Sequence, residues 1–151
     1  MEQDRSCFTI GVFKDSNWAE RGFEALRRDD FPEESLSMVA QCSPETEALL
    51  KKIFGVPVEP ISISGVGDVF SHGLLVNTLQ GSDNALTSTG IAATISRAGF
   101  QVHDGFIFET LISQGGILVA IKSEPRAADA LALLHSYGGG NAAIGAWGGR
   151  V

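Results

Sequence analysis

Five side chains in the middle of the chain could carry acid–base or metal chemistry. Asp68 and His72 are four residues apart, a spacing that places a carboxylate and an imidazole on one face of a helix, where they could hold a metal or exchange a proton. His103, Asp104 and Glu109 could supply further ligands from a neighbouring helix. The simpler interpretation, which we favour, is that Asp68 stabilises a helix dipole and that His72 is partly exposed. We therefore predict no metal, with Asp68, His72 and His103 as the candidates that an ion would use.

The remaining motifs predict neither a catalytic residue nor a cofactor. Gly65-Val66-Gly67 lacks the third glycine and the preceding strand of a dinucleotide fingerprint. Cys7 and Cys42 should lie at opposite ends of two parallel strands, roughly 20 Å apart at ~3.3 Å per residue, so we expect buried thiols and no disulfide. No Ser–His–Asp arrangement follows from local spacing.

Periodicity and capping signals predict the elements that would position these residues. Strands alternate apolar side chains at period two, and helices begin at Ser, Asn or Pro signals and end at Gly. We expect strands at Phe8–Phe13, Ser35–Gln41, Ile117–Lys122 and Asn141–Trp147. The expected helices run from a cap within Asp15-Ser16-Asn17 to about Asp30, over Pro44–Phe54, Val66–Leu79, Asn84–Ala98 and Asp104–Gln114, and onward from Ser123-Glu124-Pro125.

This order of elements predicts the α+β class, with a ferredoxin-like βαβ-βαβ arrangement over residues 1–151 as a single domain. Its sheet would have four antiparallel strands, with Phe8–Phe13 and Ile117–Lys122 as the central pair. A helical insertion at residues 61–115 would separate the second and third strands. The two helices of this core can cover only one face of the sheet, so Leu118 and Ala120 would lie on a second face. The insertion, another subunit or both would have to cover that face. The expected core residues are Ile10, Val12, Leu36, Met38, Val119 and Ile121.

Composition excludes several classes of partner. The 151 residues carry a formal charge of −7, which disfavours nucleic acid and anionic membranes because both require clustered Lys and Arg. No apolar window of ~20 residues is present, so we expect no membrane span. The first ten residues, MEQDRSCFTI, contain acids and no apolar leader segment, and we expect a cytoplasmic location with reduced thiols.

Three segments carry a resemblance to a known family. They are TIGVFKDSNWAERGFEALRRDDFPEESLSMVA, with its Ala19-Glu20 and Ala25-Leu26 pairs, the Gly-rich ISGVGDVFSHGLL, and SQGGILVAIKSEPRAADALALLHSYGG. Together they resemble the bacterial general stress protein family, also called the heat-induced stress protein domain. The family's insert is often apolar enough to suggest membrane association, whereas this one contains Asp68, His72, Asn77 and Gln80. The resemblance implies a fold and no established activity.

The sequence thus predicts a stress-associated, soluble, non-enzymatic domain that self-associates as a homodimer or larger even-numbered assembly through its sheet face or its insertion. The alternative is a small-ligand sensor, or an enzyme, with a pocket between the sheet and the insertion. Polar groups converging near Asp68, His72 and His103 would favour this alternative.

Overall fold

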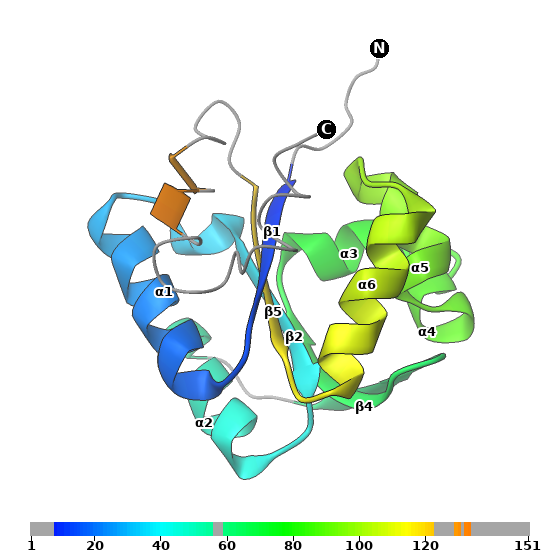
Figure 1. Cartoon of the computed structure of the whole chain (residues 1–151), viewed down its shortest axis with the longest axis horizontal. Helices are drawn as coiled ribbons and strands as arrows, with labels where there is room; N and C mark the ends of the chain where they lie inside the picture. The colour runs from blue at the N-terminus through cyan, green and yellow to red at the C-terminus, as the bar shows by residue number, and fades with distance from the viewer. Residues whose placement is uncertain (1–7, 56–58, 123–128, 131, 134–151) are drawn as a thin grey trace.

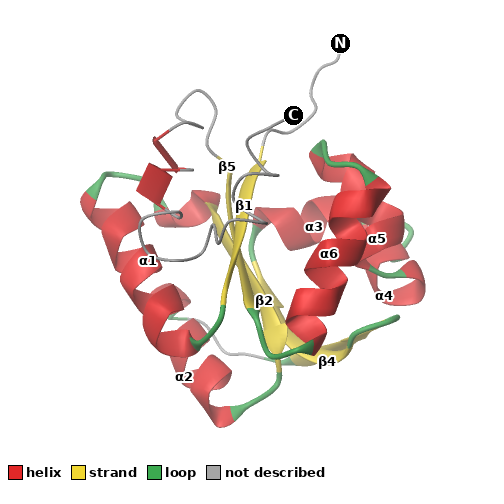
Figure 2. Ribbon diagram, in the orientation of Figure 1, coloured by secondary structure: helices red, strands yellow, loops and turns green. Residues whose placement is uncertain are grey.

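The computed structural model of the chain describes residues 8–55, 59–122, 129, 130, 132 and 133. Within this part, one antiparallel sheet of five strands has the order β1-β5-β2-β4-β3. Helices cover both of its faces, so the arrangement is a helix–sheet–helix sandwich (Figures 1 and 2). The strands are β1 (Phe8–Phe13), β2 (Leu36–Gln41), β3 (Pro60–Ile63), β4 (Gly67–His72) and β5 (Ile117–Lys122).

Strand β5 lies between β1 and β2 and is antiparallel to both. The predicted pairing of Phe8–Phe13 with Ile117–Lys122 is confirmed, with a register that runs from Phe8 opposite Lys122 to Phe13 opposite Ile117. The two strands are not the central pair, however, because β1 lies at the edge of the described sheet. Strands β1 and β2 are consequently parallel to each other and separated by β5. Because parallel strands require a crossover connection, α1 (Ser16–Arg28) joins them.

The first helical layer consists of α1 and α2 (Pro44–Phe54). Helix α1 begins at Asp15, whose Oδ1 accepts from the Trp18 N–H at 2.9 Å. Helix α2 has the predicted bounds, with Ser43 in a capping box and Gly55 ending the helix in a left-handed conformation. The short 3₁₀ turn η1 (Glu33–Ser35) precedes β2. The core between this layer and the sheet includes Phe13, Phe23, Leu26, Leu36, Met38, Leu50, Ile53, Ile117, Val119 and Ile121.

The second helical layer is built from the segment predicted as an insertion. It contains α3 (Leu74–Gln80), α4 (Ala85–Thr89), α5 (Ile91–Thr94), the 3₁₀ helix η2 (Ile95–Ala98) and α6 (Val102–Ser113). These elements occupy the face of the sheet opposite α1 and α2 (Figure 2). Their core with the sheet includes Ile10, Val12, Val39, Val69, Leu75, Leu79, Ile91, Ile95, Phe108, Ile112, Leu118 and Ala120. None of the described helices is both long enough and apolar enough to cross a bilayer.

Two of the predictions about the fold are therefore wrong in detail. The sheet has five described strands in a different order from the predicted four-stranded ferredoxin-like sheet, although the α+β class holds. The segment 61–115 is not wholly helical, because β3 and β4 form a hairpin that extends the sheet beside β2. Gly65, at φ 87°, lies in the turn of that hairpin, and Gly67, at φ 97°, is the first residue of β4. The predicted helix Val66–Leu79 is reduced to Leu74–Gln80.

The sheet face predicted to be open is covered by the chain itself. Leu118 is 1% exposed and Ala120 is 0% exposed beneath the second helical layer. Of the covers that the sequence allowed, the insertion is the one that packs on this face, so self-association through the sheet face loses its premise. All six residues predicted for the core are buried. The predicted strand Asn141–Trp147 lies outside the described residues, and 129, 130, 132 and 133 are helical as predicted.

Val119→Ala tests the central position of β5. Val119 is fully buried between the sheet and the α1–α2 layer, and the loss of two methyl groups should lower the free energy of unfolding by about 1–3 kcal/mol. Lys122→Ala truncates the exposed residue at the end of the same strand and should change the free energy of unfolding far less, because it removes no buried apolar group. Equal midpoints of chemical denaturation for the two variants would contradict the central placement of β5.

Candidate functional site

Asp68 and His72 do not form the predicted helical pair, because both lie on strand β4. Their even spacing puts them on the same face of the strand as Phe70, which packs toward the α1–α2 layer. Four residues of extended strand separate them by about 13 Å. That separation is too large for both side chains to bind one ion or to share one proton.

The acidic side chains predicted as further ligands are occupied by backbone groups on the other side of the sheet. Asp104 is buried and accepts from the Gln101 N–H at 3.1 Å, which completes a capping box at the start of α6. Glu109 accepts from the Ala92 N–H at 2.8 Å and thereby joins α6 to α5. His103 is exposed at the start of α6. The described residues contain no group of three or more His, Cys, Asp or Glu side chains that could hold a metal.

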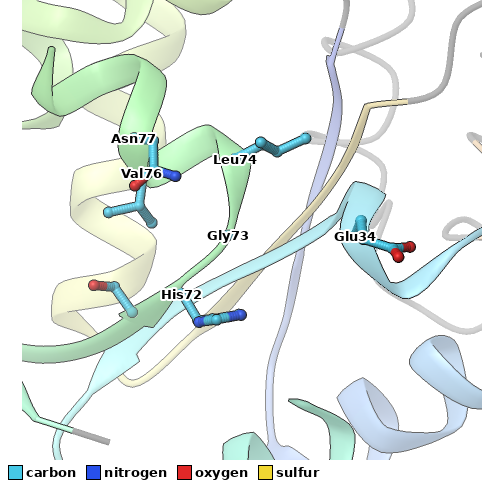
Figure 3. A pocket seen from close by; sticks show the side chains of 7 residues that line it. Glu34, His72, Gly73, Leu74, Val76 and Asn77 are labelled. Carbon is cyan, nitrogen blue, oxygen red and sulfur yellow. The ribbon is translucent and has the colours of Figure 1, made fainter. Parts of the chain in front are cut away.

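A pocket of about 360 Å³ lies where β4 passes into α3. Figure 3 shows its side chains around this junction. Of the three residues on which we expected a pocket to converge, only His72 contributes; Asp68 and His103 do not line it. The lining residues are Glu34, Ser71, His72, Gly73, Leu74, Val76 and Asn77.

Gly73 shapes this pocket by turning the chain from the sheet into α3. Its φ of 116° is a conformation that favours glycine. A Cβ at this position would lie 2.5 Å from the Leu36 carbonyl oxygen and 2.4 Å from the Ser37 Oγ. Strand β2 therefore passes so close to the junction that only glycine fits.

Ser37 of β2 caps α3 from a distant part of the chain. Its fully buried Oγ accepts from the Leu75 N–H at 2.9 Å, and no side chain at the N-cap position of α3 does so. A buried backbone N–H without a partner is costly. No local pattern predicts this contact, because its partners are 38 positions apart in the chain.

The imidazole of His72 is oriented by Phe54 at the end of α2. The ring centroids are 4.5 Å apart with an interplanar angle of 52°. Phe54 is itself buried against Phe23 of α1. One wall of the pocket is thus attached to the core on the α1–α2 side.

Cys42 is exposed just after β2, contrary to the expectation of a buried thiol. Partial desolvation, followed by the negative charges of Asp68 and Glu47, raises the pKa of this thiol above its ordinary value. A raised pKa leaves less thiolate at neutral pH, so Cys42 is a poor nucleophile. Cys7 and His135 lie outside the described residues.

Comparison with known proteins assigns no family. No family model, curated protein or solved structure matches the chain. The functional conclusions below therefore depend on the geometry and on the residues themselves.

The separation of the sequence-predicted ligands leads to a prediction about metals. Elemental analysis after gentle purification should detect no stoichiometric zinc, iron or nickel, because Asp68 and His72 cannot bind the same ion. One metal per chain that is lost in His72→Ala and kept in His103→Ala would overturn this account and place His72 at a metal site.

The contact between Ser37 and α3 leads to a stability prediction. Ser37→Ala leaves the Leu75 N–H unpaired in a buried position and should lower the free energy of unfolding by about 1–2 kcal/mol. Amide exchange at Leu75 should accelerate as well. Ser62→Ala makes the same change at an exposed position on β3 and should have little effect. Indistinguishable denaturation midpoints for the two variants would show that Ser37 does not stabilise α3.

Proposed function

We propose that this chain is a non-enzymatic association domain that binds a second copy of itself through the outer face of α6. The observation that carries the proposal is a pair of exposed apolar side chains one helical turn apart. Val102 is 50% exposed and Phe106 is 57% exposed, more than any other large hydrophobic side chain among the described residues. Large apolar side chains that gather on one face commonly mark an interface.

The same face is free of charge. The exposed residues of α6 and its flanks are Gln101, Val102, His103, Phe106, Thr110, Ser113 and Gln114. None of them is an Asp, Glu, Lys or Arg. Two copies of a chain with a formal charge of −7 repel each other, so they approach most easily through surfaces that carry no charge.

The charge asymmetry extends over the whole second helical layer. Fifteen Asp, Glu, Lys and Arg residues lie between Lys14 and Lys52, whereas only four lie between Gly73 and Gly116. Arg97 forms a bidentate ion pair with Asp83, and this hydrogen bonding lowers the pKa of Asp83. Asp104 and Glu109 accept from backbone N–H groups. Every charged side chain of this layer therefore already has a partner within the layer.

This proposal moves the association surface away from the covered sheet face and onto the outside of the insertion. An antiparallel crossing of two α6 helices would bring both Phe106 side chains to a twofold axis. The stress-associated role that the family resemblance implies stays part of the proposal, and an association domain of this kind is compatible with it.

Phe106→Glu tests the surface. Each dimer would lose two buried aromatic side chains worth about 2 kcal/mol apiece, which should raise the dissociation constant roughly a thousandfold. Light scattering at micromolar concentration should give at least twice the 16.0 kDa chain mass for the native chain and the monomer mass for the variant.

The matched control for this experiment is Trp18→Glu. It places the same charge at an exposed apolar residue of α1, on the opposite side of the sheet, and should leave the dimer intact. A native chain that stays monomeric at high concentration would contradict the proposal. Equal loss of association in both variants would show that added charge, and not the α6 face, is responsible.

A further inference from the structure

The pocket at the junction of β4 and α3 lies outside the proposed association surface on α6, and four of its lining side chains are polar. Its polar walls carry a carboxylate, an imidazole, an amide and a hydroxyl, from Glu34, His72, Asn77 and Ser71. Within the described part of the chain, none of these four side chains has a hydrogen-bonding or ion-pair partner. The charged side chains of the adjoining helical layer, by contrast, are all engaged.

The charge of the pocket favours a cation. Glu34 is the only Asp, Glu, Lys or Arg among the described residues that line it. An anionic ligand would find no positive partner there, and the formal charge of −7 on the chain opposes it as well. An ammonium group could pair with the carboxylate of Glu34, which is exposed at the pocket.

The remaining walls suit a short apolar group. Leu74 is a large hydrophobic residue whose side chain is 38% exposed, and Val76, which also lines the pocket, is half-buried. The imidazole of His72, which packs against Phe54, adds a flat aromatic side to the pocket. The volume of about 360 Å³ is at the lower end of the range for small-molecule pockets.

We infer that this pocket binds a small primary amine with a short apolar chain. Glu34 provides the charge partner, and Leu74 and Val76 contact the alkyl chain. The inference is independent of self-association, because these residues belong to η1, β4 and α3, whereas the proposed interface lies on α6.

Three probes with the same alkyl chain test the charge preference: n-butylamine, n-butanol and butyrate, at matched pH and ionic strength. Titration of the ¹⁵N-labelled chain with n-butylamine should shift the Gly73 and Leu74 amide resonances saturably. The alcohol and the carboxylate should shift them weakly and without saturation. Equal saturable shifts from butyrate, or no saturable shift from the amine, would overturn the inference.

Two neighbouring glutamates supply the matched variants. Glu34→Gln removes the charge from the pocket with little change of shape and should raise the dissociation constant for n-butylamine by about fivefold or more. Glu33→Gln removes the same charge from the exposed adjacent position, which does not line the pocket, and should change it less than twofold. An equal effect of both variants would indicate general attraction to an acidic surface and would contradict a specific site. The amide spectra themselves report whether each variant is folded.

Discussion

Strand β5 is apolar on both faces, and the rest of the structure depends on covering both of them. Ile117, Val119 and Ile121 point to one side, and Leu118 and Ala120 point to the other. Any strand of this kind needs two layers of cover. Helices α1 and α2 supply one layer, and the segment from α3 to α6 supplies the other. Because one chain provides both layers, its apolar sheet faces are not available to a partner.

The elements with strong local signals could be predicted from the sequence. Helix α2 has the expected bounds because Ser43, Pro44 and Gly55 specify its two ends by local chemistry. Strands β1 and β5 could be recognised from their apolar residues, and their pairing could be predicted from the order of elements along the chain. The start of α1 lies within the predicted capping segment Asp15-Ser16-Asn17, with Asp15 as the cap.

The weakly polar middle of the chain could not be predicted in the same way. Gly67–His72 contains two apolar residues, and nothing local separates helix from strand there. Its backbone forms hydrogen bonds with β2 on one side and β3 on the other, so tertiary pairing decides its conformation. This change from helix to strand also separates Asp68 from His72. The predicted Asp68–His72 site does not form for this reason. The pocket at the β4–α3 junction could not be predicted either, because it depends on close contacts of Gly73 with Ser37 and Leu36, which are distant in sequence.

The central claim is that each chain covers both faces of its own sheet. Amide hydrogen exchange of β5, measured at a high and a low protein concentration, tests this claim most directly, because cover from the same chain does not depend on association. We predict that the amides of Leu118, Val119 and Ala120 are among the slowest to exchange at both concentrations. Protection of these amides that falls on dilution would mean that a second chain covers the sheet, and would contradict the account.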